Sequence, residues 1–141
     1  MVFTNGCFDL LHIGHTRYLA EAKGLGDYLV VGINSDASVR QLAKSTDRPI
    51  VPAEQRAEVL AALACVDYVT IFDEPDPLAL LQALKPNILV KGGDWSTDRI
   101  VGKAFVEAQG GSVRSIPLIP DISTTKIVEK ILAHRPLKSP L

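Results

Sequence analysis

Two of the chain's three histidines, His12 and His15, lie in the motif HIGH, directly after an apolar run. Residues three apart on a helical turn share one face of the helix, so both rings are placed to offer N–H donors to one ligand. Gly14 between them allows that ligand to approach the backbone. A helix N-terminus would add free N–H groups and a positive dipole end, and together these features suit a phosphate chain.

Other interpretations of HIGH stay open. In one, a histidine caps the helix and the other is a buried, hydrogen-bonded residue. In another, the histidines bind zinc with Asp9 as a third ligand, although the spacing matches no known zinc pattern. The preceding turn is built from small residues, Asn5, Gly6 and Cys7. It contains neither GxGxxG nor GxxxxGK(S/T), so two common nucleotide fingerprints are absent.

Two further segments carry groups that suit a nucleotide. In VKGGDW, Lys91 ends an apolar run, Gly92 permits close backbone approach, and Asp94 supplies an acid, a set that suits a sugar or base. A glycine turn with solvated charges is the alternative. In DISTTK, three hydroxyls open a helix where one would suffice as a cap, which indicates a second anion site. Capping plus ordinary surface is the alternative there. These hydroxyls belong to Ser123, Thr124 and Thr125.

Three basic residues accompany this set. Lys44 and Arg48 lie in the segment AKSTDRPIV, and Arg56 lies in the helix expected after it. A basic loop beside a phosphate site neutralises developing charge. Solvated surface charge is the alternative, and it is favoured for Arg48.

Alternating strands and helices must position these residues. Short, Val- and Ile-rich runs predict buried strands over 1–4, 28–33, 67–72, 87–92 and 112–118. Helix-like segments cover 15–25, 35–43, 52–64, 76–85, 97–111 and 123–134. This alternation predicts an α/β fold with a doubly wound parallel sheet, whose ligands bind beyond the carboxyl ends of the strands.

Bulk properties narrow the class of protein. The 141 residues suit one domain, expected over 1–134, with residues 135–141 as a flexible tail containing two prolines. A net charge of −1 gives no reason to expect nucleic-acid or membrane binding. Two cysteines without CxxC spacing, and no leader or membrane-length run, indicate a cytoplasmic protein.

The motifs together resemble those of the HxGH nucleotidyltransferase superfamily. The resemblance is strongest to the D-glycero-β-D-manno-heptose 1-phosphate adenylyltransferases, and it runs from about residue 2 to residue 132. Many relatives have a glycine just before the Ser-Thr-Thr helix, where this chain has Pro120, Asp121 and Ile122. The motifs that carry the resemblance are TNGCFDLLHIGH, GINSD, RPIVPAEQR, VDYV, VKGGDW and ISTTKI.

The resemblance implies a Rossmann-like, five-stranded parallel sheet in the order 3-2-1-4-5, with helices on both faces. It also implies transfer of AMP from ATP to heptose 1-phosphate, with Mg²⁺ bound with ATP and release of pyrophosphate. His12, His15, Lys44 and Thr124 would be catalytic. Asp9 would bind substrate on the acceptor side, and Arg56 would bind substrate near the phosphates or the acceptor. The nucleotide would be bound by Asn5, Gly6, Cys7, Phe8, Gly14, Lys91, Gly92, Asp94, Ser123 and Thr125.

Alternatives and partners follow from the same resemblance. A cytidylyltransferase acting on glycerol 3-phosphate shares HxGH and ISTT, and a non-catalytic nucleotide-binding module is a different class of answer. Class I aminoacyl-tRNA synthetases also carry HIGH, but this chain lacks KMSKS and is too short to read tRNA. The resemblance implies a homodimer. It also implies a sugar kinase as a fused or separate partner.

Overall fold

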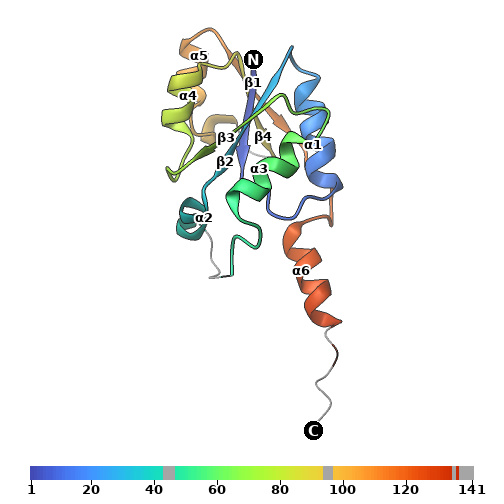
Figure 1. The fold of residues 1–141 in the computed structure, drawn as a ribbon. Coiled ribbons are helices and arrows are strands. Elements are labelled where there is room, and N and C mark those ends of the chain that lie inside the picture. Colours follow the sequence, from blue (N-terminus) through green and yellow to red (C-terminus); the bar gives the residue numbers. More distant parts are fainter. Residues whose placement is uncertain (43–46, 94–96, 135, 137–141) are drawn as a thin grey trace.

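Five short apolar runs form one parallel sheet in the computed structural model, which describes residues 1–42, 47–93, 97–134 and 136 (Figure 1). Within these residues the strand order is β3-β2-β1-β4-β5, which confirms the predicted doubly wound topology. The strands are β1 (Val2–Gly6), β2 (Leu29–Asn34), β3 (Tyr68–Phe72), β4 (Ile88–Gly92) and β5 (Ser112–Ile116).

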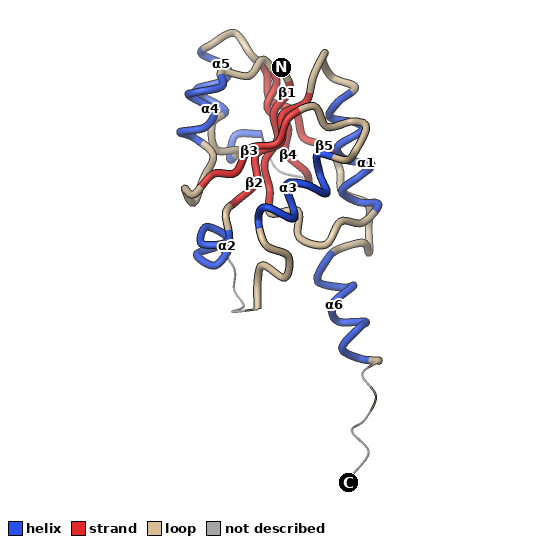
Figure 2. Tube along the Cα trace, in the orientation of Figure 1, coloured by secondary structure: helices blue, strands red, loops and turns tan. Residues whose placement is uncertain are grey.

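Helices cover both faces of the sheet, with α1 and α3 on one side and α4 and α5 on the other (Figures 1 and 2). The last helix, α6, extends away from the body. None of the helices in the described ranges is long and apolar enough to cross a membrane. The helices are α1 (Ile13–Lys23), α2 (Asp36–Leu42), α3 (Ala53–Ala61), α4 (Leu78–Leu84), α5 (Lys103–Ala108) and α6 (Thr124–Ala133), with a 3₁₀ turn, η1 (Thr97–Arg99).

The single helix expected over 97–111 is wrong, because the chain breaks it into η1 and α5. Gly102 lies between them with φ of 90°, a left-handed conformation that glycine adopts without a steric penalty. A Cβ at this position would lie 2.2 Å from Leu81 Cδ1 of α4. Close packing against α4 therefore requires both the bend and the glycine.

Alternating side chains of the central strands build a core on each face of the sheet. Val2 of β1 packs with Leu19 of α1 in one cluster, whereas its neighbour Phe3 packs with Leu81 of α4 in the other. Because both faces are covered, successive residues are apolar, which is why the strands appear in the sequence as continuous runs.

The sheet opens between β1 and β4 at its carboxyl edge. These two strands pair only as far as Thr4 and Val90, whereas β1 stays paired with β2 through Gly6. On the other side, β4 stays paired with β5 through Gly92. The next residues in register, Asn5 and Lys91, therefore flank a gap. This gap is the switch point at which ligands bind in doubly wound sheets.

Candidate active site

The loop that leads from β1 into α1 has an unusual backbone. Phe8 and Leu10 have φ of 50° and 52°, in the left-handed region. For residues other than glycine this region costs about 1–2 kcal/mol per residue, so the surrounding structure must hold the conformation. The contacts of this loop therefore decide where the histidines lie.

Asp9 fastens the loop to the segment before α3. Its side chain is 6% exposed. One carboxylate oxygen accepts from the Ile50 amide at 2.8 Å and the other accepts from the Val51 amide at 2.9 Å. The Arg48 guanidinium adds an ion pair at 3.4 Å. Both oxygens of Asp9 are thus engaged within the protein, which accounts for its burial as a charged residue.

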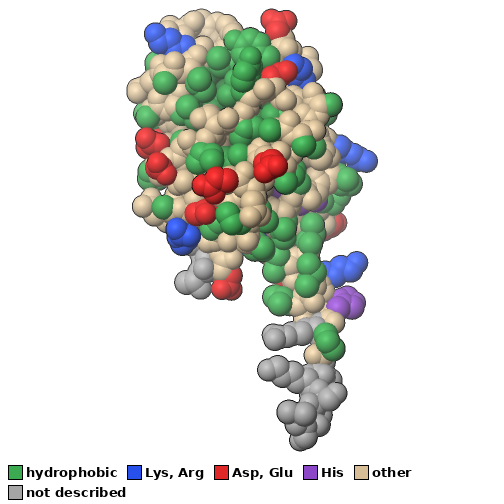
Figure 3. Space-filling view, in the orientation of Figure 1, with side chains coloured by type: hydrophobic (Ala, Val, Ile, Leu, Met, Phe, Trp, Pro, Cys, Tyr) green, Lys and Arg blue, Asp and Glu red, His purple; other side chains and the backbone are tan. Residues whose placement is uncertain are grey.

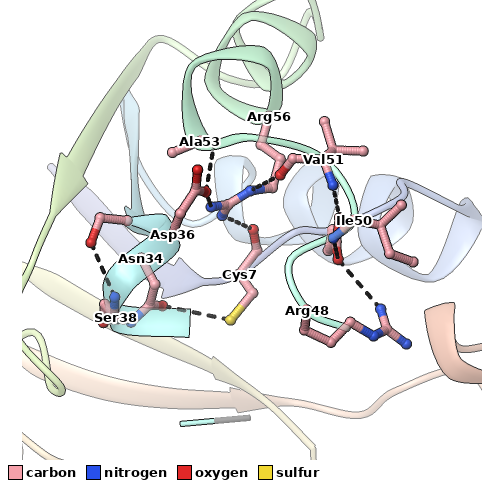
Figure 4. A network of polar contacts seen from close by, with 11 residues as sticks. Cys7, Asn34, Asp36, Ser38, Arg48, Ile50, Val51, Ala53 and Arg56 are labelled. Atoms are coloured by element: carbon pink, nitrogen blue, oxygen red, sulfur yellow. Dashed lines mark hydrogen bonds and ion pairs between the residues drawn. The ribbon is translucent and has the colours of Figure 1, made fainter. Parts of the chain in front are cut away.

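Arg56 of α3 makes a second set of contacts with the loop (Figure 4). Its side chain is only 2% exposed. Its guanidinium donates to the Cys7 carbonyl at 2.7 Å, to the Val51 carbonyl at 2.8 Å and to Asp36 Oδ1 at 2.8 Å. Asp36 also accepts from the Ala53 amide at the start of α3. A planar, three-way donor of this kind fixes the relative positions of the β1–α1 loop, α2 and α3.

The histidines cap α1 with their Nδ1 atoms. His12 is the N-cap, and its Nδ1 accepts from the Gly14 amide at 3.1 Å. His15 Nδ1 accepts in turn from the His12 amide at 3.3 Å, which completes a capping box. The two rings stack with their centroids 3.9 Å apart. The capping interpretation of HIGH is therefore confirmed for His12, and it leaves the Nε2 atoms of both rings for a ligand.

Burial favours the neutral form of both imidazoles. It lowers the pKa of His15 to about 4, to which the neighbouring His12 ring contributes, and it also lowers the pKa of His12. Because each Nδ1 is a hydrogen-bond acceptor, the proton of the neutral ring lies on Nε2. The pair thus offers two N–H donors before any anion binds.

A cavity of about 570 Å³ lies over the gap between β1 and β4. Three of the predicted segments meet in it: the HIGH turn, the end of β4 and the start of α6. The predicted site residues that line it are Asn5, Gly6, Cys7, Phe8, His12, Gly14, His15, Lys91, Gly92, Ser123 and Thr124.

The hydroxyls at the start of α6 have separate tasks. Ser123 is the N-cap and accepts from the Lys126 amide at 3.1 Å. Thr124 donates its hydroxyl to the Asp9 carbonyl at 2.6 Å, which ties α6 to the β1–α1 loop. Thr125 lies outside the cavity lining and accepts from Arg48 at 3.4 Å. Just before this helix Asp121 has φ of 63°, the conformation that a glycine would adopt freely.

Several site predictions fall elsewhere in the structure. Asp9 and Arg56 do not line the cavity, because their polar atoms hold the loop beneath it. Lys44 and Asp94 lie outside the described residues.

Part of the cavity wall comes from residues outside the sequence motifs. Tyr18 lies one turn after His15, a spacing that could have identified it, and its hydroxyl is hydrogen-bonded to Thr4 at 2.5 Å. The residues of the β3–α4 loop and the η1 turn gave no sequence signal. The missed lining residues are Tyr18, Pro75, Asp76, Pro77, Arg99, Ile100, Val101, Leu118, Ile119 and Ile122.

Paired imidazole donors and a second helix N-terminus lie at the switch point of this doubly wound sheet. Together they define a nucleotide-binding α/β domain of the HxGH type. The chain belongs to the cytidylyltransferase-like family, whose family model matches residues 3–130, and it is a nucleotidyltransferase.

The chain is also similar to several known proteins over most of its length. It is 56% identical over 132 residues to "Bifunctional protein HldE" of Syntrophotalea carbinolica, and 54% identical to that of Geobacter sulfurreducens. Each match covers 94% of this chain but 27% of the relative, so the chain spans about a quarter of their length. Among solved structures, a lipopolysaccharide core biosynthesis protein from Thermoplasma volcanium is 31% identical with a TM-score of 0.68, and the match covers 84% of this chain and 94% of that one.

His12 variants separate capping from ligand binding. Asparagine is among the best N-caps, so His12→Asn keeps an acceptor for the Gly14 amide but removes the Nε2 donor. We expect thermal or denaturant unfolding to show His12→Asn within about 0.5 kcal/mol of the wild type, and His12→Ala to lose about 1 kcal/mol. In both variants the rate of nucleotidyl transfer should fall roughly 10²–10³-fold. A fully active His12→Asn protein would exclude Nε2 from the chemistry.

Arg56 is testable by a change that keeps its charge. Arg56→Lys supplies one ammonium where the structure uses three donors on a planar group. Carbonyls of Cys7 and Val51 then lose donors, and we expect a loss of roughly 2–4 kcal/mol in unfolding free energy. The exposed Arg40 of α2 provides the control, since Arg40→Lys should change stability by less than about 0.5 kcal/mol. Equal stability of the two variants in denaturant titrations would contradict the role assigned to Arg56.

Proposed function

We propose that the chain transfers AMP from ATP to heptose 1-phosphate, giving ADP-heptose and pyrophosphate. The observation that carries this proposal is the HIGH turn: His12 and His15 line the cavity at the start of α1, and the Nδ1 atom of each ring is already used in capping. The choice of heptose and of ATP rests on the similarity to HldE and on the resemblance of NGCFD and KGGDW to the heptose branch. Cytidylyl transfer to glycerol 3-phosphate is the second candidate, and the family description supports it.

The proposed step is a direct displacement. An oxygen of the acceptor phosphate forms a bond to the α-phosphorus of ATP while the bond from that phosphorus to the bridging oxygen breaks. The electron pair leaves with pyrophosphate. The acceptor oxygen is already anionic, so no general base is needed and neutral histidines suffice. The work of the site is alignment of two phosphates and stabilisation of charge on the leaving group.

His12 and His15 would supply uncharged donors to the triphosphate. Their neutrality matters because a neutral donor needs no counter-ion before the substrate binds. Its hydrogen bond to the substrate still becomes stronger as negative charge develops. The start of α6 would hold the distal phosphates, as Ser123 and Thr124 line the cavity there. Lys44 is proposed to approach the α-phosphate.

Mg²⁺ is proposed to arrive with ATP. Among the described residues the cavity wall offers a single carboxylate, Asp76, and both oxygens of Asp9 are engaged by backbone amides. Such a site fits a magnesium ion whose ligands are mostly phosphate oxygens and water. When bound, the ion would offset charge on the pyrophosphate.

We propose a cytoplasmic homodimer that works with a sugar kinase, fused or separate. The exposed face of α6 supports an intermolecular contact, since Ile131 and Leu132 are 64% and 61% exposed and no residue of this helix is buried.

Pyrophosphate release tests the proposal directly. We expect release when ATP and heptose 1-phosphate are supplied together, with ADP-heptose as the second product. The controls replace ATP by CTP and heptose 1-phosphate by glycerol 3-phosphate. Faster release with CTP and glycerol 3-phosphate would replace the proposal by the second candidate. Absence of release with every pair would favour a nucleotide-binding module.

A further inference from the structure

Lys91 stands at the point where the sheet opens. Its Nζ donates to Asn5 Oδ1 at 2.5 Å, so a side-chain hydrogen bond joins β4 and β1 where their backbone pairing has ended. Both residues line the cavity. The ammonium is therefore held at the cavity wall where β1 and β4 separate.

The charge of Lys91 lacks a matching anion within the part of the chain that the structure describes. Its only hydrogen-bond acceptor there is the neutral amide of Asn5, and the ion pairs of the described residues do not include it. Burial lowers its pKa to about 8, which leaves it mostly protonated at neutral pH. A desolvated cation without a counter-ion is costly, and an incoming anion would remove that cost.

The direction of Lys91 places it apart from the histidines. Side chains alternate along a strand, and Phe3 and Leu89 pack on the α4–α5 face of the sheet. Two residues further on, Asn5 and Lys91 belong to the same face. This half of the cavity is bounded by the β3–α4 loop and by Arg99, Ile100 and Val101. His12, His15 and Tyr18 come from the start of α1, on the opposite face.

We propose that Lys91, oriented by Asn5, binds the phosphate group of the acceptor in the half of the cavity on the α4–α5 face. This inference rests on the proposed function and assigns the second substrate a place within it. It differs from the nucleoside contact that the sequence resemblance implied for Lys91. Arg99 supplies a further cation on the wall of the same half.

Simple electrostatics supports this division of the cavity. The reaction brings an anionic phosphate monoester up to the α-phosphate of ATP, and like charges repel strongly where water is scarce. In the proposed reaction, the histidines and the α6 N-terminus bind the triphosphate on one side of the gap. A cation at the gap between β1 and β4 would offset the charge of the second phosphate as it approaches from the other side.

Lys91→Met tests the inference, with Lys23→Met as the matched control. Lys23 pairs with Asp67 beside Leu29, at the amino-terminal end of β2 and far along the sheet from the cavity. For Lys91→Met we expect the KM for heptose 1-phosphate to rise roughly 10- to 100-fold, the value of one hydrogen bond to a charged group. The Kd for ATP should change less than twofold. Inorganic phosphate should compete with heptose 1-phosphate, and its inhibition constant should rise by a similar factor in Lys91→Met.

Stability and a conservative variant keep the test decisive. Loss of a desolvated ammonium should leave the Tm of Lys91→Met equal to or above that of the wild type. Lys91→Arg should recover part of the affinity for the acceptor. If the Kd for ATP rose as much as the KM for heptose 1-phosphate, or more, Lys91 would bind the nucleotide and the inference would be overturned. Kinetic constants of Lys91→Met equal to those of Lys23→Met would also overturn it. A wild-type protein inactive with every acceptor would instead contradict the proposed function itself.

Discussion

The loop between β1 and α1 cannot take its shape from its own sequence, because Phe8 and Leu10 both lie in the left-handed region without being glycines. Its conformation persists because distant parts of the chain hold it. Asp9 accepts two amides from the segment before α3, and Arg56 of α3 donates to the Cys7 carbonyl. The orientation of α1, and with it the histidine pair, depends on these contacts. The cost of the strained backbone is thus met by buried polar contacts outside the cavity.

This arrangement separates positioning from chemistry. Charged groups that are fully engaged by the protein, Asp9 and Arg56, lie beneath the cavity, whereas the histidine pair lines it. The histidines illustrate the principle on a smaller scale, since Nδ1 of each ring is used for capping and Nε2 is left over. Catalysis by charge stabilisation needs donors that are fixed before the charge appears, and the capping box fixes them.

Much of the fold was open to prediction from the sequence. The continuous apolar runs predict buried parallel strands, and their spacing predicts helices between them, because both faces of the sheet must be covered. The break at Gly102 is not predictable from the local pattern, since it depends on the close approach of Leu81 from another helix. The strand order came from the resemblance rather than from the pattern of residues.

The site was predictable where its residues lie in short motifs and not where they meet through the fold. HIGH and the Ser-Thr-Thr turn are local patterns with a local mechanism. Asp9 accepts hydrogen bonds from Ile50 and Val51, which lie some forty positions further along the chain. No local pattern could therefore show that its carboxylate holds a loop in place. The resemblance implied a place near the phosphates or the acceptor for Arg56. Its three acceptors come from three segments of the chain and become visible only in the structure.

Amide hydrogen exchange of the ligand-free protein tests most directly whether the loop is held before any substrate binds. The amides of Ile50 and Val51, which donate to Asp9, and that of Gly14, which donates to His12, are the reporters. We expect all three to exchange slowly without nucleotide and to change little when ATP is added. Rapid exchange at these amides, slowed only by ATP, would show that the substrate organises the loop and would contradict a site organised in advance.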